Sequence, residues 1–167
     1  AWLMPGAGDF LEQAARLGGI EHLSLETRGR RKVLGKGHPG MPGLRRLWLD
    51  RSGAAAYMLW PEGARKLLAR AAAVPGLADA VPVETRGLLR WQAAPALAIQ
   101  VDMAARYGLT PPIAVESAIS TVARPARGGV KFRLRRIARQ LAMGLAGLRP
   151  CTERVEVRPA ALQGDDR

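Results

Sequence analysis

Few side chains in this sequence are placed where they could do chemistry, and Glu84 is the first of them. It follows the apolar run Val81-Pro82-Val83 at an expected strand-to-helix corner, so its carboxylate could act as a general base or could cap the helix. His22 lies in an alternating apolar stretch and is expected to be packed there. His38 lies in a segment rich in Gly and Pro and has no evident partner in the sequence. These residues by themselves define no reaction.

The sequence lacks the established motifs for phosphate binding, acyl transfer and zinc-dependent hydrolysis. It has no GxxxxGK[ST], GxSxG or HExxH sequence, and no GxGxxG between an expected strand and a helix. The sequence has no internal DxD pair of the kind that holds a divalent cation, and Asp165-Asp166 lies in a polar tail. Asp50 and Glu62 fit turn and helix-capping roles. Cys151 is the single cysteine beside two histidines, which excludes an intramolecular disulfide and argues against a structural zinc site.

The composition fits one globular domain with a strongly basic charge. The 167 residues include 26 Lys and Arg against 14 Asp and Glu, a formal net charge of +12, and 48% of the residues are hydrophobic. These values exclude wholesale disorder, and no apolar run approaches the ~18 residues that span a bilayer. Most of the basic residues are arginine in an Ala-rich chain, which a codon bias can produce. The charge alone therefore does not identify a binding surface.

Strand and helix patterns alternate along the chain, which predicts an α/β protein. We expect the end of a buried strand at 1–4, strands over 20–26, 44–49 and 54–60, and two strands around Pro95 within 88–100. We expect helices from an N-cap at Asp9 to Leu17, over 64–73 after Pro61-Glu62, and over 133–148. Segment 35–43 has Gly or Pro at six positions and is predicted to be a loop.

The expected helix 133–148 is amphipathic and lies in the most basic part of the chain. Its apolar residues fall within an arc of about 100°, and the opposite side carries Arg133, Arg135, Arg136 and Arg139. Between residues 116 and 153 there are eight basic residues and no acidic one. The polar side could be a solvated face, or it could dock on an anionic membrane at about 1 kcal/mol per basic residue near the lipid. Nucleic-acid binding is not expected, because Phe132 is the only aromatic residue available for base stacking there.

Four short segments together match the pattern of a known family. Residues 53–68 are Gly-Ala-Ala-Ala-Tyr-Met-Leu-Trp-Pro-Glu-Gly-Ala-Arg-Lys-Leu-Leu, and residues 81–84 are Val-Pro-Val-Glu. Residues 89–100 are Leu-Arg-Trp-Gln-Ala-Ala-Pro-Ala-Leu-Ala-Ile-Gln, and residues 116–119 are Glu-Ser-Ala-Ile. In this order they resemble the G-T-x-A-Y-…-G-A-x-K-L-L, P-V-D, aromatic-x-x-x-P-x-hydrophobic-x-x-Q and S-D-I segments of glycosyltransferase family 25. The resemblance extends from about residue 1 to residue 120.

The resemblance implies a GT-A-like nucleotide-sugar transferase fold, which is an α/β sandwich, and a hexosyl transfer reaction. Members of the family build lipopolysaccharide or lipooligosaccharide, often as galactosyltransferases, or modify collagen. The expected reaction transfers a hexose, galactose first, from a UDP-sugar donor to a lipopolysaccharide or other glycan acceptor. The resemblance also implies a divalent cation, Mn²⁺ or Mg²⁺, that stabilises the leaving diphosphate. The expected location is cytoplasmic and peripheral on the inner face of the cytoplasmic membrane.

The resemblance further predicts that the GT-A-like fold is N-terminally truncated in this chain. In the family an acidic E-D-D cluster precedes a segment like Ala1–Leu17, so the cation ligands would lie before residue 1 and none is expected within the chain. We therefore expect the chain to be inactive on its own. Residues 1–122 would be the C-terminal part of the transferase domain, 123–150 a basic helical extension and 151–167 a polar tail.

The resemblance assigns expected roles to five residues of this chain. Glu84 stands where the family has the Asp of P-V-D and is the first candidate for the general base or for an acceptor contact. Gly53 and Tyr57 are expected to shape the acceptor side of the cleft. Gln100 and Ser117 are weaker candidates for substrate binding.

Three positions depart from the family pattern. The family has Thr, Asp and Asp where this chain has Ala54, Glu84 and Ala118. The alternative function is a non-catalytic basic module that docks on an anionic membrane surface through the arginine side of helix 133–148. A nucleic-acid-associated protein is the third hypothesis, and no nucleic-acid partner is expected.

Overall fold

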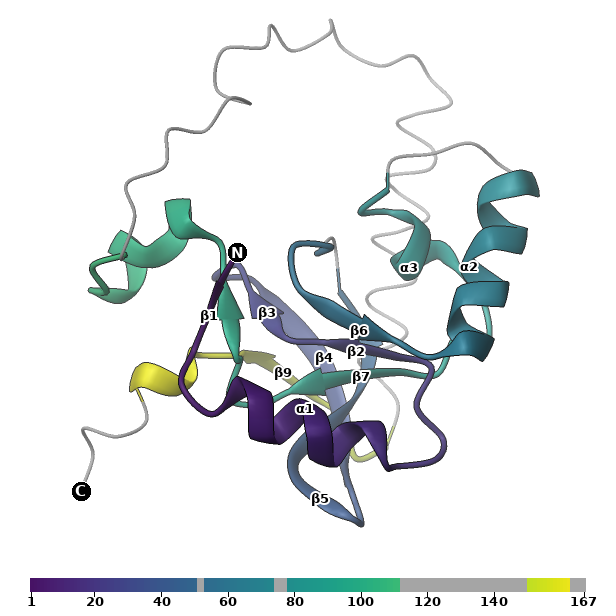
Figure 1. Cartoon of the computed structure of the whole chain (residues 1–167), viewed down its shortest axis with the longest axis horizontal. Helices are drawn as coiled ribbons and strands as arrows, with labels where there is room; N and C mark the ends of the chain where they lie inside the picture. The colour runs from purple at the N-terminus through teal and green to yellow at the C-terminus, as the bar shows by residue number, and fades with distance from the viewer. Residues whose placement is uncertain (51–52, 74–77, 112–149, 163–167) are drawn as a thin grey trace, which may run out of the picture.

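The computed structural model of the chain describes residues 1–50, 53–73, 78–111 and 150–162 (Figure 1). Ser117, the expected helix 133–148 and the expected domain division at 122 lie outside these residues. The described residues contain both sheets and helices, which confirms the α/β prediction at that level. Among them, no helix combines the length and the apolar character that crossing a membrane requires.

The larger sheet has six strands. They are β2 (His22–Ser24), β4 (Arg31–His38), β5 (Met41–Leu49), β6 (Tyr57–Leu59), β7 (Arg90–Ala93) and β9 (Glu153–Glu156). Their order in the sheet is β6-β2-β7-β5-β4-β9. β2 runs parallel to β7, and the other neighbouring strands are antiparallel.

A smaller sheet of three strands continues from the larger one. Its strands are β1 (Trp2–Leu3), β3 (Glu26–Thr27) and β8 (Ala98–Ile99), in the order β1-β8-β3. β3 follows β2 after the single residue Leu25, and β3 and β8 are parallel, as β2 and β7 are. The Leu25 carbonyl accepts hydrogen bonds from the backbone N–H groups of Leu97 and Ala98 across this bend. The stretch 20–26, predicted as one strand, is therefore divided between two sheets.

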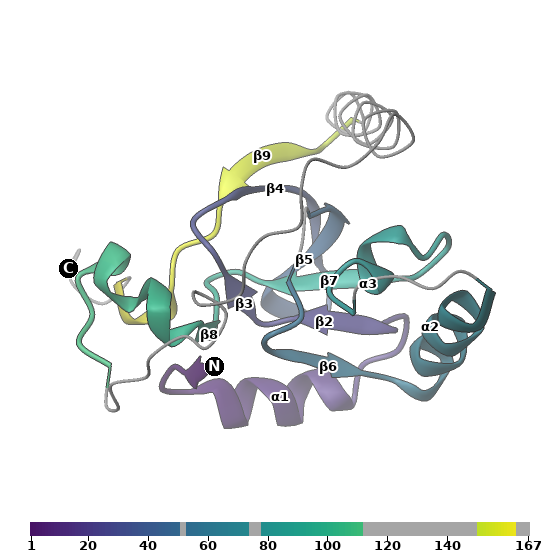
Figure 2. The same cartoon turned by 90° about the horizontal axis from the view of Figure 1, so that it is seen from above.

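Helices lie on one face of the larger sheet, past the ends of its strands and beside the smaller sheet (Figures 1 and 2). They are α1 (Ala7–Ala15), α2 (Pro61–Ala73), α3 (Val81–Glu84) and the 3₁₀ helices η1 (Val101–Tyr107) and η3 (Ala160–Leu162). α1 runs along one face of the larger sheet, and α2 and α3 lie next to each other beyond its β6 end (Figures 1 and 2). α1 begins at Ala7 after Gly6, so Asp9 lies in its first turn and is not the predicted N-cap.

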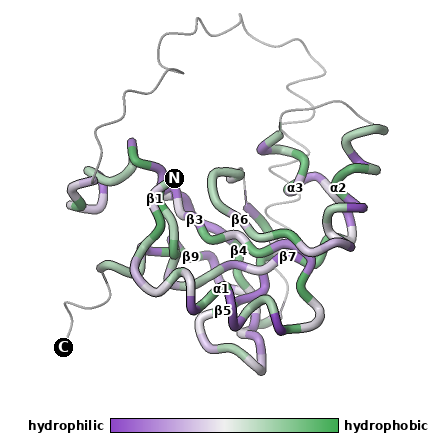
Figure 3. Tube along the Cα trace, viewed as in Figure 1, coloured by the Kyte–Doolittle hydropathy of each residue, from purple (hydrophilic) through white to green (hydrophobic). Residues whose placement is uncertain are grey.

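Side chains alternate strictly across the central strands. Leu23 on β2, Met58 on β6 and Ala93 on β7 belong to the apolar cluster that packs against α1. Their neighbours in sequence point to the opposite face, because successive side chains of a strand take opposite faces. Figure 3 shows hydrophilic stretches that run into the middle of the sheet. The fold therefore has one apolar sheet face under α1 and one polar face.

The prediction of a loop over 35–43 is wrong, since most of this segment belongs to the hairpin of β4 and β5. Glycine here permits close packing within a strand. A Cβ on Gly35 would lie 2.5 Å from the indole Nε1 of Trp48, so only glycine leaves room for that ring. The register of β4 against β5 shifts several times between Val33 and His38, so the glycines of β4 lie in an irregular part of the strand pairing.

The helix after Pro61 and the turn at Pro95 follow the predictions. α2 starts at Pro61 with Glu62 in its first turn, where Glu62 pairs with Arg65. Pro95 follows a cis peptide bond between β7 and β8. β1 confirms a strand at the start of the chain, but Leu3 is half-exposed, so this strand is not fully buried as expected.

Gly63 marks the closest approach of α2 to the sheet, and its replacement by alanine is expected to destabilise the protein. A Cβ at Gly63 would overlap the Glu21 carbonyl oxygen, which already accepts a hydrogen bond from Trp60 N at 3.1 Å. We expect Gly63→Ala to lower the free energy of unfolding by about 1–3 kcal/mol, measured by urea denaturation. Gly8→Ala is the control, because Gly8 lies in α1 with no atom near the position of its Cβ. Equal effects of the two substitutions would contradict this account.

Candidate functional site

The polar face of the larger sheet carries side chains that are seldom buried. His22 and Ser24 on β2 are 2% and 3% exposed, and Arg90 and Gln92 on β7 are 7% and 0% exposed. Buried polar groups carry a free-energy cost unless they are paired, so a concentration of them requires either mutual hydrogen bonds or a function. This face is therefore the first place to look for a site.

Lys32 holds the centre of the polar face together. Its Nζ is 2.8 Å from Asp50 Oδ2 and donates to Gln92 Oε1 at 2.6 Å, to the Glu26 carbonyl at 2.9 Å and to Ser24 Oγ at 3.4 Å. Lys32 and Asp50 are both buried. Asp50 was predicted to have a turn or capping role, and the structure corrects this to one half of a buried ion pair. The sequence could not indicate this, because the partner comes from a different strand.

Glu26 is the buried carboxylate beside this network. Glu26 is 1% exposed, and its Oε1 accepts a hydrogen bond from the backbone N–H of Ala55 at 3.1 Å. Gln100 Nε2 lies 3.4 Å from Glu26 Oε2. Gly53 has a φ of +150°, and a Cβ there would lie 2.6 Å from Glu26 Oε1. Within the described part of the chain, no cation lies within salt-bridge distance of this carboxylate.

The structure brings together three of the five residues that the resemblance assigns. Gly53 and Gln100 both approach Glu26, and Tyr57 follows Gly53 closely and packs on His22 of the same face. Glu84 lies elsewhere, at the end of α3, where its Oε2 is 2.8 Å from Arg70 Nη2 of α2. Both views show α3 beside α2, whereas β3, which carries Glu26, lies toward β1 and β8 (Figures 1 and 2).

Sequence reasoning missed Glu26, although one pattern in the sequence could have found it. His22, Ser24 and Glu26 occupy every second position of an otherwise apolar stretch, while Leu23 and Leu25 fill the positions between. Such alternation predicts that the three polar side chains share one face. Whether that face is solvated or buried depends on segments that are distant in sequence.

His22 is neutral at physiological pH. Burial, and next the positive charge of Arg90, lower the pKa of His22 from 6.5 to about 4, with Lys32 acting in the same direction and Asp50 against it. Arg90 donates from Nη2 to the Trp48 carbonyl at 2.9 Å, and burial lowers the pKa of its guanidinium to about 10, so Arg90 stays charged.

This pKa predicts a pH-dependent stability. The unfolded chain takes up a proton at His22 near pH 6.5 and the folded chain only near pH 4, so stability is lost as the pH falls through this interval. The expected loss from His22 is about 3 kcal/mol. Urea denaturation of the wild type and of His22→Phe at several pH values checks it. Their difference in unfolding free energy should change between pH 6.5 and 4 and stay constant above pH 7, and parallel curves would refute the assignment.

A shallow cavity of about 300 Å³ has a lining that includes neither Glu26 nor its neighbours Gly53, Ala55 and Gln100. Its described lining consists of Lys36, Gly37, Arg46, Trp48, Trp91, Pro150 and Cys151. The guanidinium of Arg46 lies 5.1 Å from the ring centroid of Trp48 and 5.8 Å from that of Trp91. His38, predicted to have no evident partner, packs edge-on against Trp91, and its Nδ1 accepts the Gly40 N–H. The described lining includes no carboxylate, so we take the polar face as the candidate site.

The described residues do not form a site for the expected divalent cation. Within residues 1–50, 53–73, 78–111 and 150–162, no group of three or more His, Cys, Asp or Glu side chains is arranged to hold a metal ion. Asp50 is paired with Lys32, and Glu26 accepts hydrogen bonds from neutral donors.

Comparison with known proteins adds no relative. Neither a scan against protein-family models nor searches of curated proteins and of solved structures found a match to this chain. The functional interpretation therefore depends on the four motif segments and on the geometry of the polar face.

Proposed function

We propose that this chain is the acceptor-side part of a glycosyltransferase similar to family 25, with a GT-A-like fold. The supporting observation is that Gly53 and Gln100, which the resemblance selects from distant segments, both approach one buried carboxylate, that of Glu26. An inverting transferase needs a carboxylate that can accept the proton of the acceptor hydroxyl. The parallel pairing of β2 with β7 in a mixed sheet is compatible with such a fold.

The proposed reaction moves a hexose, galactose first, from a UDP-sugar to a hydroxyl of lipopolysaccharide or another glycan. The acceptor oxygen forms a bond to the anomeric carbon while the bond from that carbon to the UDP oxygen breaks. UDP leaves with the electron pair of that bond, and the acceptor proton passes to a carboxylate. A divalent cation bound by the transferase would stabilise the leaving diphosphate, and no step here depends on it.

Glu26 and Glu84 are the two candidates for the general base that takes the acceptor proton, and their contacts favour Glu26. Glu84, the candidate from the sequence, is engaged by Arg70 on α2. The Glu26 carboxyl group is buried, and its hydrogen-bond donors among the described residues, Ala55 N–H and Gln100, are neutral. A buried carboxylate without a cationic partner lowers stability, and a function would explain why it is present. The segment 53–57 covers Glu26 and must shift for an acceptor hydroxyl to reach it.

Transfer of radiolabelled sugar tests the proposed function. The complete gene product that contains this chain is incubated with labelled UDP-galactose and a lipopolysaccharide acceptor, with UDP-glucose and UDP-N-acetylglucosamine as alternative donors. We expect acceptor-dependent incorporation of label, and no incorporation by residues 1–167 alone. Samples without acceptor control for hydrolysis of the donor. If the complete protein transfers none of these sugars, the proposed function is wrong.

We also propose peripheral contact with the inner face of the cytoplasmic membrane. The support is the run of eight basic residues without an acidic one between residues 116 and 153. Binding to vesicles that contain phosphatidylglycerol should be strong at low salt and weak at high salt, because the attraction is electrostatic. Neutral phosphatidylcholine vesicles are the control, and equal binding to both would contradict this contact.

A further inference from the structure

His22 is buried with both ring nitrogens unsatisfied. The residue is 2% exposed, and neither Nδ1 nor Nε2 has a hydrogen-bond partner among the residues that the structure describes. Nearly all buried polar atoms in folded proteins are hydrogen-bonded, so an imidazole with two free nitrogens lowers stability. A phenylalanine in the same place would have no such cost. A ligand with hydrogen-bonding groups would give these two nitrogens the partners that the described residues do not supply.

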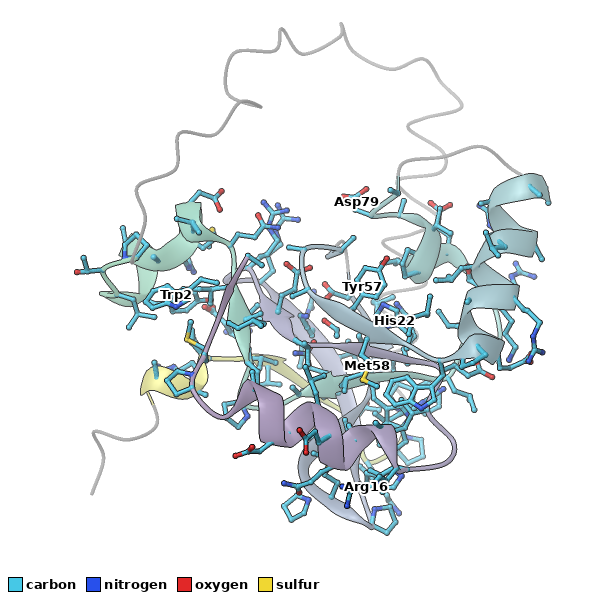
Figure 4. The ribbon with its side chains drawn as sticks, in the orientation of Figure 1. Trp2, Arg16, His22, Tyr57, Met58 and Asp79 are labelled. Carbon is cyan, nitrogen blue, oxygen red and sulfur yellow. The ribbon has the colours of Figure 1, made fainter. Side chains whose placement is uncertain are left out.

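Tyr57 is the cover over this imidazole. The two rings stack, with centroids 5.1 Å apart and an interplanar angle of 20°. Tyr57 is 43% exposed and lies on β6, which is the edge strand of the larger sheet. Figure 4 shows His22 and Tyr57 on the side of the sheet away from α1, whereas Met58 points toward α1. A rotation of the Tyr57 side chain, with no change in strand pairing, would uncover the ring face of His22 on which Tyr57 stacks.

The charges around His22 decide which ligand fits. Burial, and next the positive charges of Arg90 and Lys32, lower the pKa of His22 and keep the ring neutral, while the charge of Asp50 acts in the opposite direction. A neutral imidazole has one N–H donor and one acceptor nitrogen, so it matches a hydroxyl group, which donates and accepts. The neighbouring phenol ring offers an apolar face for the C–H face of a sugar. A metal cation would be repelled by Arg90 and Lys32.

We infer that His22 and Tyr57 form a sugar-binding contact, with His22 hydrogen-bonded to a ligand hydroxyl and Tyr57 packed on the sugar ring. The inference rests on the proposed function for the statement that this sugar belongs to the glycan acceptor. Tyr57 belongs to the segment 53–57, which also covers Glu26 through the Ala55 N–H. Rotation of the Tyr57 side chain would uncover the imidazole while β6 stays paired, and displacement of residues 53–55 would uncover the carboxylate.

Nitrogen-15 NMR of the two histidines tests the contact. The complete protein is titrated with lactose and with the methyl glycosides of galactose, glucose and N-acetylglucosamine. We expect one of these sugars to shift the ring nitrogens of His22 and to leave those of His38, the internal control, unchanged. If none of them shifts the His22 nitrogens at the highest soluble concentration, the inference is overturned.

The His22→Phe variant separates ligand binding from folding. We expect it to bind the sugar about tenfold or more weakly, and to be as stable as the wild type or more stable at pH 7 because an unsatisfied polar group is removed. His38→Phe is the matched variant and should keep wild-type affinity. Undiminished affinity in His22→Phe, or a clear loss of stability at pH 7, would overturn the inference. If the His22 shift occurs but the complete protein transfers no hexose, the sugar contact stands and the proposed function fails.

Discussion

Replacing Glu26 with glutamine should lower hexose transfer by the complete protein about 10²–10⁴-fold, with little change in fold. Glutamine keeps an oxygen that can accept the Ala55 N–H, and its amide can pair with Gln100 in the place of the carboxylate. What it removes is the carboxylate that we propose takes the proton of the acceptor hydroxyl. The drop should appear in kcat more than in KM, because the substitution acts on the proton transfer.

Glu84→Gln is the matched control for this prediction. It neutralises a second carboxylate, which lies in an ion pair with Arg70 and away from Gly53 and Gln100. We expect it to keep near-normal turnover. The opposite result, with Glu84→Gln inactive and Glu26→Gln active, would restore Glu84 as the general base and assign Glu26 a structural role. Circular dichroism of both variants confirms that folding is preserved.

Replacing Lys32 with methionine should lower the free energy of unfolding by about 3–5 kcal/mol. The substitution leaves the Asp50 carboxylate buried without its cation, and it removes the donor to Gln92 and to the Glu26 carbonyl. Methionine fills a similar volume, so the loss comes from uncompensated charge and unmade hydrogen bonds. Urea denaturation at pH 7 measures the loss.

Two comparisons isolate the buried pair. Lys36→Met removes an exposed lysine from the same strand and should change stability by less than about 0.5 kcal/mol. The double variant Lys32→Met, Asp50→Leu removes both charges and should recover a large part of the lost stability, because no unpaired ion remains. If Lys32→Met is as stable as Lys36→Met, the pair has no structural importance.

Much of the local structure follows directly from the sequence. Pro61 and Glu62 predict the start of α2, because proline suits the first turn of a helix and an acid there interacts favourably with the helix dipole. Pro95 predicts the turn between β7 and β8. The alternation at residues 22–26 fixes which side chains share a face. These features depend on backbone preferences and on period, which neighbouring residues determine.

Other features depend on partners that are distant in the chain. The glycines of 35–43 predict a loop, but β5 and the Trp48 ring pack closely on this segment and make it a strand. The residue type and sequence context of Asp50 are typical of a turn. In the structure Asp50 forms an ion pair with Lys32, which lies eighteen positions earlier in the chain. Glu84 occupies the acidic position of the segment that resembles P-V-D, but in the structure it forms an ion pair with Arg70 on α2.

By itself, the sequence determined the classes of element, the polar and apolar faces of the strands and the four motif segments that suggest sugar transfer. Only the tertiary structure decided that Gly53 and Gln100 approach Glu26, and that His22 is buried beneath Tyr57 with no hydrogen-bond partner in the described part of the chain. The physical reason is that period and propensity act over a few residues. Burial, ion pairing and an unsatisfied ring nitrogen depend on which distant strands lie side by side.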